Sequence, residues 1–311
     1  MPPFVVAIAQ RAPVYGDGAA TLDRLDAIAK EATSEGATLV VFGETWLGGY
    51  PAWLDRAPGA ALWEHEPSKE AYLELVRTSI AVPGPETERM GALCARHGIA
   101  MVIGVHERPR RGPGQGTLFN TLLVFDQRGE LAVHHRKLVP TYNERLVWGP
   151  GDGHGLVTAE MPFGRLGGLI CWEHWMPLAR QAMHDAGETV HVALWPSVNE
   201  SHQLSSRHYA FEGRCFVLAA GSIMRRADLP RAFAEPGDGD ELILRGGSAV
   251  IGPDGNYVIE PVFDEERLLV AELDPERVET ERMTLDVSGH YARPDVFELT
   301  VERRRLLREP K

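Results

Sequence analysis

The sequence predicts an α/β fold in which mixed β-sheets are covered by helices on the outside. Short apolar runs rich in β-branched residues, such as FVVAIA (4–9) and TLVVFG (38–43), alternate with segments whose apolar residues recur at helical spacing. The strands are apolar throughout, which is typical of strands buried on both faces. No linker-like or low-complexity tract divides the 311 residues, so we expect one domain over residues 1–300 and a charged tail at 301–311.

A helix is predicted between these first two strands. Thr21 is suited to cap its N-terminus and Gly36 its C-terminus, and its apolar face consists of Leu22, Leu25, Ile28, Ala29 and Ala32. A second unit of the same kind follows. The segment PETERMGALCARHG (85–98) places proline at the first helical position and glycine at the end, and IAMVIGV (99–105) predicts the next strand.

The rest of the chain predicts two hairpins and a second series of strands and helices. Residues 118–137 alternate around a QRG turn, and residues 246–260 form a similar pair around a DG turn. Further strands are expected at 166–171, 190–195 and 215–221, helices at 176–187 and within 205–214, and loops at 149–155 and 225–240.

Composition narrows the possible partners and the compartment. The formal net charge of −12 argues against nucleic acid, because phosphate binding needs a basic face. No run approaches the roughly 20 apolar residues that span a bilayer, and the N-terminus lacks a basic leader. The basic clusters at 108–111 and 303–308 are interpreted as a solvated loop and tail. Three cysteines without paired spacing indicate no disulfide framework, so we expect a cytoplasmic protein.

Three polar residues stand at the carboxyl ends of predicted strands, where reactive groups gather in α/β sheets: Glu44, Lys137 and Cys171. Each alone has an ordinary structural explanation, as a helix cap, a solvated lysine and a core cysteine. Together they offer a base for the thiol proton, a cation and a nucleophile. The cation would stabilise negative charge on a substrate nitrogen or oxygen. The set suits attack on carbon multiply bonded to either atom.

Other kinds of site find no support in the sequence. His134 and His135 are adjacent on a strand, so they point to opposite faces and cannot share a metal. No H-E-x-x-H or Cys-x-x-Cys spacing occurs. The glycine-rich segment 149–155 lacks the G-x-G-x-x-G order. We therefore expect neither a metal nor a cofactor, and we expect Cys94 and Cys215 in the core.

Three segments around the candidate residues resemble the catalytic segments of the nitrilase superfamily, in order and spacing. They are GETWLGGYPAW (43–53), HRKLVPTYNERLVWGPGDG (135–153) and GGLICWEHWMPLAR (167–180). The resemblance runs from residue 4 to about residue 299. Within the superfamily, Trp172 and Glu173 after the cysteine, together with SGHYARPDVFEL (288–299), are similar to the true nitrilase and cyanide-hydrolysing branch.

The resemblance implies a four-layer α-β-β-α sandwich and a cofactor-free hydrolase. Such an enzyme converts an organic nitrile to the carboxylic acid and ammonia through a covalent intermediate on cysteine. An amidase and a cyanide hydratase or dihydratase of the same superfamily are the alternatives among enzymes. A non-catalytic binding or assembly module that keeps the fold is the alternative from another class. The resemblance also implies a homodimer or a larger homo-oligomer.

By the same resemblance, Cys171 is the nucleophile, Glu44 the general base and Lys137 the cation beside the tetrahedral species. Glu144 matches a second active-site glutamate that positions lysine, substrate or water. The backbone N–H of Trp172 would complete the anion-stabilising pocket. Glu173 is expected to hold the strand end by hydrogen bonds. The aromatic residues expected to line the substrate pocket, with a core position as the alternative for each, are Tyr50, Tyr142, Trp172 and Trp195.

Overall fold

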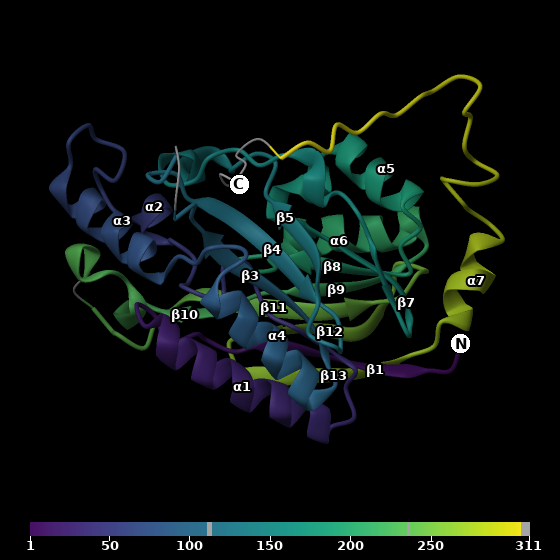
Figure 1. The fold of residues 1–311 in the computed structure, drawn as a ribbon, viewed down its shortest axis with the longest axis horizontal. Helices are drawn as coiled ribbons and strands as arrows, with labels where there is room; N and C mark the ends of the chain where they lie inside the picture. The colour runs from purple at the N-terminus through teal and green to yellow at the C-terminus, as the bar shows by residue number, and fades with distance from the viewer. Residues whose placement is uncertain (111–113, 235–236, 306–311) are drawn as a thin grey trace.

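Two β-sheets pack face to face, and helices cover their outer faces (Figure 1). A computed structural model describes residues 1–110, 114–234 and 237–305. The layers follow the order helix, sheet, sheet, helix. The predicted four-layer sandwich is therefore confirmed.

The first sheet has six strands in the order β13-β1-β2-β3-β4-β5. The pairs β1·β2 and β2·β3 are parallel, and the other pairs are antiparallel. Its strands are β1 (Phe4–Gln10), β2 (Leu39–Val41), β3 (Ala100–Glu107), β4 (Phe119–Phe125), β5 (Leu131–Arg136) and β13 (Arg267–Leu273).

The second sheet runs in the order β10-β11-β9-β8-β7-β6, with β12 paired to β11. Its parallel pairs are β7·β8 and β8·β9. Its strands are β6 (Ala159–Met161), β7 (Gly164–Ile170), β8 (Val190–Leu194), β9 (Phe216–Ala220), β10 (Ile223–Arg225), β11 (Leu242–Ile251) and β12 (Tyr257–Phe263). Both predicted hairpins are present, as β4·β5 and β11·β12.

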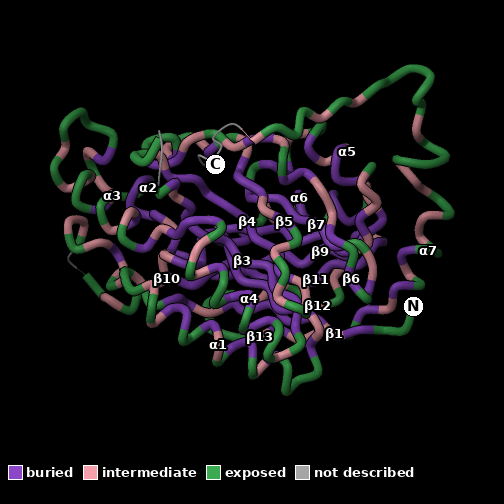
Figure 2. Tube along the Cα trace, in the orientation of Figure 1, coloured by how far each residue is buried: buried purple, intermediate pink, exposed green. Residues whose placement is uncertain are grey.

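Helices form the two outer layers. The helices are α1 (Gly18–Ser34), α2 (Trp53–Arg56), α3 (Glu66–Thr78), α4 (Pro85–His97), α5 (Pro177–Asp185), α6 (Glu200–Gly213) and α7 (Glu276–Arg282). Apolar side chains of α1 and α4 pack on the outer face of the first sheet. Those of α5 and α6 pack on the second sheet. Figure 2 shows buried residues concentrated in the strands and exposed residues on the outer surfaces.

The apolar strands owe their character to burial on both faces. Every residue of β3 and of β4 is buried. One face contributes to the core between the sheets, through residues such as Val102 and Leu122. The other face meets α1 and α4, through residues such as Met101 and Leu123. The predicted core positions of Cys94 and Cys215 are also confirmed, since both thiols are free and completely buried.

Some local predictions differ from the structure. The first helix begins one turn early, because the carboxylate of Asp17 caps it by accepting a hydrogen bond from Ala20 N. Thr21 lies inside the helix and donates its hydroxyl to backbone oxygens. The expected loop at 225–240 contains the end of β10 and two short 3-10 turns. Helices α3 and α7 and strand β13 were not predicted. Strand β13 pairs with β1 from more than 250 residues away.

The basic clusters are only partly solvated. Arg110 is exposed and pairs with Glu86 at 2.9 Å. Arg305, by contrast, is mostly covered and pairs with Asp152 at 3.0 Å, so the tail returns to the body of the protein. Residue 111, residues 235–236 of the expected loop and residues 306–311 of the expected tail lie outside the described residues.

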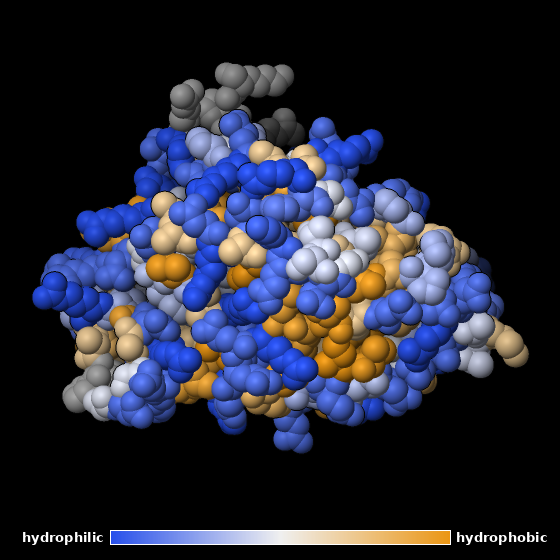
Figure 3. All heavy atoms as spheres, turned by 90° about the horizontal axis from the view of Figure 1, so that it is seen from below, coloured by the Kyte–Doolittle hydropathy of each residue, from blue (hydrophilic) through white to orange (hydrophobic). Residues whose placement is uncertain are grey.

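The surface is mixed in character. Figure 3 shows the face seen from below Figure 1, where a large hydrophobic patch and several smaller ones lie among hydrophilic residues. Over residues 1–110, 114–234 and 237–305, no helix has both the length and the apolarity required to cross a membrane.

Candidate active site

Glu44 lies just after β2, at the carboxyl end of the strand, and its side chain is buried. Its backbone N–H points to the carbonyl of Trp195, which follows β8 in the other sheet. The turn at residues 43–45 packs directly on Gly104 of β3. A Cβ at that glycine would lie 2.3 Å from the backbone nitrogen of Thr45, so any side chain there would displace the turn that carries Glu44.

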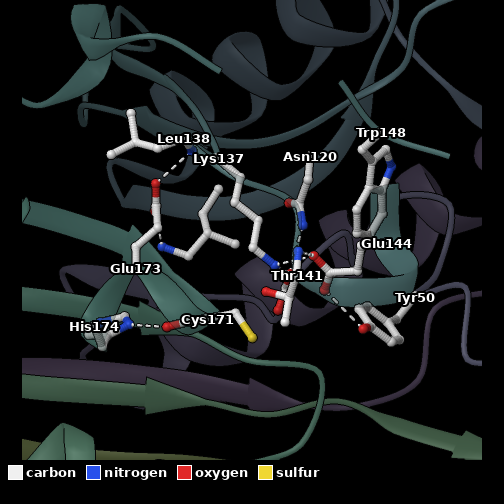
Figure 4. Close-up of polar contacts among 12 residues, drawn as sticks. Tyr50, Asn120, Lys137, Leu138, Thr141, Glu144, Trp148, Cys171, Glu173 and His174 are labelled. Atoms are coloured by element: carbon white, nitrogen blue, oxygen red, sulfur yellow. Dashed lines mark hydrogen bonds and ion pairs between the residues drawn. The ribbon is translucent and has the colours of Figure 1, made fainter. Parts of the chain in front are cut away.

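Lys137 follows β5, and its backbone N–H donates to the carbonyl of Asn120 in β4 at 2.8 Å. Its ammonium lies between two carboxylates (Figure 4). Nζ is 2.9 Å from Oε1 of Glu44 and 2.7 Å from Oε2 of Glu144. Asn120 donates its side-chain N–H to the same oxygen of Glu44 at 2.6 Å. The buried lysine is therefore fully paired.

Glu144 lies in the 3-10 turn η1 (Tyr142–Leu146). Its Oε2 also accepts the backbone N–H of Thr141 at 2.6 Å, and its Oε1 accepts the hydroxyl of Tyr50 at 3.0 Å. Both oxygens are thus engaged, which fixes the carboxylate against Lys137. This geometry agrees with the positioning role expected for Glu144.

Cys171 occupies the junction between β7 and the 3-10 turn η3 (Cys171–Trp175). Its φ of 53° lies in the left-handed region, which residues with a side chain rarely adopt. Strained backbone of this kind persists only where its surroundings hold it, and it concentrates at functional sites. The sharp turn directs the sulfur toward Lys137 and Glu144 (Figure 4).

The structure brings all four predicted catalytic residues together. One carboxylate oxygen of Glu44, one of Glu144 and the sulfur of Cys171 lie within 4.8 Å of one another. Oε2 of Glu44 is buried and has no hydrogen-bond partner among the described residues. A free, buried carboxylate oxygen beside a thiol can accept the thiol proton.

Burial shifts the ionisation of these groups. Burial, strengthened by Glu144 and opposed by Lys137, raises the pKa of Glu44 to about 7. Burial also raises the pKa of Cys171 well above its usual value, with Glu44 adding to the effect. Burial alone would lower the pKa of Lys137, but Cys171, Glu44 and Glu144 raise it above the usual range. The resting site therefore holds a thiol, an ammonium and a base whose pKa lies near neutrality.

The thiol and the two carboxylates also have the spacing of metal ligands. However, the ammonium of Lys137 already lies against both carboxylates and carries the positive charge that a metal ion would supply. The one ammonium therefore pairs with both carboxylates, and with both of them ionised the three groups carry a net charge of −1.

Glu173 holds the backbone on both sides of the site. Its carboxylate accepts the N–H of Ile170 at 2.6 Å, the N–H of Leu138 at 2.8 Å and Nε2 of His135 at 2.9 Å. Burial opposes its ionisation, but His135 and the two backbone N–H groups lower the pKa of Glu173 overall. The contacts support the structural role expected for it, since Ile170 and Leu138 adjoin Cys171 and Lys137. His134 points the opposite way, to Glu107.

We expect Glu173→Gln to lower the free energy of unfolding by about 1–3 kcal/mol, because an amide NH₂ would face a backbone N–H that now has an acceptor. Urea denaturation measures the effect. Glu130→Gln makes the same chemical change on the exposed surface and serves as the control. Equal stability of the two variants would contradict the role assigned to Glu173.

A cavity of about 300 Å³ opens above Cys171. Three of the four aromatic residues expected to line a substrate pocket do line it, namely Tyr50, Tyr142 and Trp172. The remaining lining residues are Asp55, Thr141, Glu144, Pro196, Ser197, Asn199, His202 and Leu244. Glu44 and Lys137 are not among them, so they lie behind the sulfur and Glu144.

The structure does not support a pocket role for Trp195. Its side chain is completely buried and is not among the lining residues of the cavity. The indole stacks on His202 with ring centroids 4.4 Å apart and donates its N–H to Ser206. The core position, which was the alternative, is the observed one.

Sequence reasoning missed several residues of the site. Asn120, which donates a hydrogen bond to Glu44, is a buried amide in the mainly apolar strand FNTLLVF, and that contrast was the available signal. The cavity residues from 196 to 202 and Leu244 carry no local signal, because only the packing of the second sheet brings them near Cys171.

A buried thiol with an adjacent base and ammonium is the equipment of a hydrolase that attacks its substrate through sulfur. The comparison with known families also identifies a hydrolase. The family model described as carbon-nitrogen hydrolase matches residues 5–283, and the chain belongs to this family.

Its relatives include named nitrilases. The aliphatic nitrilase of Sinorhizobium fredii (strain HH103) is 39% identical over 306 residues, which cover 97% of this chain and 96% of that protein. The bifunctional nitrilase/nitrile hydratase NIT4B of Nicotiana tabacum is 37% identical over 301 residues, 94% of this chain and 84% of that protein. The resemblance to the nitrilase branch is therefore confirmed.

Solved structures confirm the fold. Saccharomyces cerevisiae Nit3, a member of branch 10 of the nitrilase superfamily, superposes with a TM-score of 0.69 at 20% identity, covering 93% of this chain and 97% of that chain. The carbon-nitrogen hydrolase from Helicobacter pylori G27 gives a TM-score of 0.68 at 20% identity, covering 91% and 93%.

Proposed function

We propose that this protein is a nitrilase, which hydrolyses an organic nitrile to the carboxylic acid and ammonia. The observation that carries the proposal is that the Glu44 carboxylate, one oxygen of which has no hydrogen-bond partner among the described residues, lies beside the sulfur of Cys171, and that Cys171 lines a cavity. The nitrilase relatives over nearly the whole chain support the substrate class.

In the first step, Oε2 of Glu44 takes the thiol proton while the sulfur of Cys171 attacks the nitrile carbon. Negative charge develops on the nitrile nitrogen. The ammonium of Lys137 stabilises this charge, as does the backbone N–H of Trp172, which faces the sulfur as a hydrogen-bond donor. The proton held by Glu44 then passes to the nitrogen, and a thioimidate remains on the enzyme.

In the second half, Glu44 removes a proton from water, and the resulting hydroxide adds to the thioimidate carbon. Protonation of the nitrogen lets ammonia leave and produces a thioester. A second water, activated in the same way, releases the acid and restores the thiol. If the first tetrahedral species expels sulfur before nitrogen, an amide is released instead.

The size and lining of the cavity favour an organic nitrile over cyanide. A space of about 300 Å³ flanked by the aromatic side chains of Tyr50, Tyr142 and Trp172 greatly exceeds what cyanide fills. The lining also contains polar residues, and polar groups beside aromatic side chains fix the orientation of a small organic ligand.

The proposal is tested by ammonia release from a panel that contains aliphatic, aromatic and arylacetonitriles, the matching amides and cyanide. We expect turnover of at least one nitrile class, and a mass increase on Cys171 when the reaction is quenched. Turnover of amides alone would assign the protein to the amidases, and turnover of cyanide alone to the cyanide-degrading enzymes. A protein that turns over none of them would be a binding or assembly module.

We also propose that the chain forms a homodimer or a larger homo-oligomer. After α7 the chain runs as an arm past α5 (Figure 1), and a cavity of about 750 Å³ lies between them. Apolar side chains here are exposed, including Leu178 at 70% and Phe297 at 77%. Surfaces of this kind mark protein contacts, and a second copy is the proposed occupant.

Light scattering coupled to gel filtration tests the assembly. We expect a mass of at least twice 34.3 kDa, and a lower mass for Phe297→Glu. A monomer at every concentration would overturn the proposal.

A cytoplasmic location is proposed as well, because all three cysteines are free. Cell fractionation checks it.

A further inference from the structure

A chain of buried hydrogen bonds leads away from the backbone of Cys171. Nδ1 of His174 is 2.7 Å from the carbonyl oxygen of Cys171 (Figure 4). Nε2 of His174 is 2.9 Å from Nε2 of His191 in β8, and Nδ1 of His191 is 2.8 Å from Oε1 of Glu188. The hydroxyl of Tyr209 in α6 donates to Oε2 of Glu188 at 2.6 Å. We call His174, His191 and Glu188 the histidine chain; all three are buried.

The acceptors in the histidine chain determine how many protons it holds. The carbonyl of Cys171 can only accept, so Nδ1 of His174 must carry a hydrogen. If His174 is neutral, its Nε2 accepts, and Nε2 of His191 must donate. If His191 is neutral as well, its Nδ1 accepts, and Glu188 must be a carboxylic acid. Moving that proton onto either histidine leaves the total unchanged. When all of these hydrogen bonds are formed, the histidine chain therefore holds one proton more than it would with an ionised Glu188 and two neutral imidazoles.

The surroundings favour Glu188 as the holder of this proton. Burial raises the pKa of Glu188 to about 7. Burial lowers the pKa of His174 to about 3, and it lowers the pKa of His191 well below the usual value. Both histidines are therefore neutral, and the carboxylic acid of Glu188 donates to His191.

The charged neighbours do not pair with the carboxyl of Glu188. Arg282 donates to its backbone carbonyl, while Arg180 and His184 bind Glu212. No arginine or lysine in the described parts of the chain is hydrogen-bonded to the carboxyl. The titratable and charged groups packed around the histidine chain are Glu173 of η3, Arg180 and His184 of α5, Tyr209 and Glu212 of α6, Cys215 before β9 and Arg282 of α7.

A glycine in the strand that precedes the nucleophile leaves space for the carboxyl of Glu188 in the histidine chain. Gly167 belongs to the GGLIC segment that ends at Cys171. A Cβ at Gly167 would lie 1.7 Å from Oε1 of Glu188. The carboxyl thus occupies the space that a side chain in β7 would otherwise fill.

We propose that His174 is a positioning residue for the nucleophile, and that one proton held by the histidine chain keeps its Nδ1–H on the carbonyl of Cys171. This bond holds the left-handed turn that aims the sulfur and the N–H of Trp172. When Glu188 ionises, both imidazoles change tautomer and a lone pair of Nδ1 faces the carbonyl. Activity therefore falls as pH rises through the pKa of Glu188. The inference rests on the proposed role of Cys171 as nucleophile.

Glu188→Gln separates this inference from a merely structural role. The glutamine amide still donates to His191 and still accepts from Tyr209, but it cannot ionise. We expect kcat at neutral pH within about threefold of the unmodified protein, and an alkaline limb moved up by at least about one pH unit. Loss of activity at all pH values, or an unchanged alkaline limb, would overturn the proposal.

His174→Phe keeps a ring against Trp195, on which His174 stacks at 4.9 Å, and removes the donor. We expect kcat to fall by about 10- to 100-fold with KM nearly constant, because small displacements of a reacting group are costly. His184→Phe is the matched control: His184 also packs on the ring of Tyr209 but lies outside the chain. It should leave kcat near that of the unmodified protein. Because His184 lowers the pKa of Glu188, its loss should move the alkaline limb to higher pH.

The tautomer of His174 gives a test that needs neither turnover nor a stable variant at Glu188. Nitrogen NMR on histidine-labelled protein, with His174→Phe for assignment, should show hydrogen on Nδ1 and none on Nε2 at a pH well below the pKa of Glu188, which is about 7. The hydrogen should move to Nε2 as the pH rises through that value. Hydrogen on Nε2 alone at the lower pH would overturn the inference. Failure of the proposed function would appear separately, as absence of nitrile turnover and of an adduct on Cys171.

Discussion

Replacing Cys171 by alanine is expected to lower kcat on the best nitrile by at least about 10⁴-fold, because no other group takes over bond formation to the nitrile carbon. The fold should persist, since the change removes only one buried sulfur atom. Initial rates of ammonia release measure the loss, and circular dichroism reports the fold. Mass spectrometry should find no adduct on the variant.

Cys94→Ala is the control for this experiment. Cys94 is as deeply buried, but it lies in α4 between that helix and the first sheet. It should lose stability without losing kcat. Substantial turnover by Cys171→Ala would refute the covalent mechanism, whatever the substrate proves to be.

Replacing Glu44 by glutamine is expected to lower kcat/KM by about 10²- to 10⁴-fold, the usual contribution of a general base. The structure explains why the variant should fold. The glutamine carbonyl can accept from Lys137 and Asn120 in place of Oε1. The amide NH₂ then occupies the position of Oε2, which has no partner among the described residues. Only the capacity to take a proton is lost.

The pH profile gives a second test of Glu44. The base must be ionised to act, and the pKa of Glu44 is about 7. Activity of the unmodified protein should therefore fall as pH drops through this value, and this acid limb should be absent from the residual activity of Glu44→Gln. Glu144→Gln is the informative comparison. The charge of Glu144 raises the pKa of Glu44, so its removal should move the acid limb to lower pH. An acid limb that survives in Glu44→Gln would assign the base elsewhere.

The names of two relatives indicate that both the acid and the amide product should be measured. One is named a bifunctional nitrilase/nitrile hydratase and another an aliphatic nitrilase. In the proposed mechanism the routes to acid and amide diverge at one tetrahedral species. Loss of nitrogen gives the thioester that is hydrolysed to the acid, and loss of sulfur gives the amide. Measuring both products from each nitrile therefore reports how the site stabilises ammonia as the leaving group.

Much of the fold followed from local patterns. The strands from β1 to β9 that carry continuous apolar runs were predictable, because burial on both faces demands such residues whatever the partner strand. The elements that were missed have weaker patterns. Strand β13 alternates between buried and exposed positions, and its register beside β1 depends on residues far away in the chain.

The candidate site divides in the same way. Glu44, Lys137 and Cys171 were found because each directly follows a buried strand, and strand ends are identified locally. The strain at Cys171, the partners of Lys137 and the burial that raises the pKa of Glu44 were not visible. Trp195 was predicted to line the pocket because its position in the sequence is close to the site. Its neighbours Pro196 and Ser197 do line the cavity, but its own ring is buried in the core.

The sequence by itself determined the α/β class, the order of most strands and the candidate reacting groups, because local burial and the chemistry of side chains follow from residue types. Only the tertiary structure decided which oxygen of Glu44 is free, what lines the cavity, and that two histidines and a glutamate stand behind Cys171. Those properties depend on distances of a few ångströms between segments that are remote in the chain, and no local pattern encodes such distances.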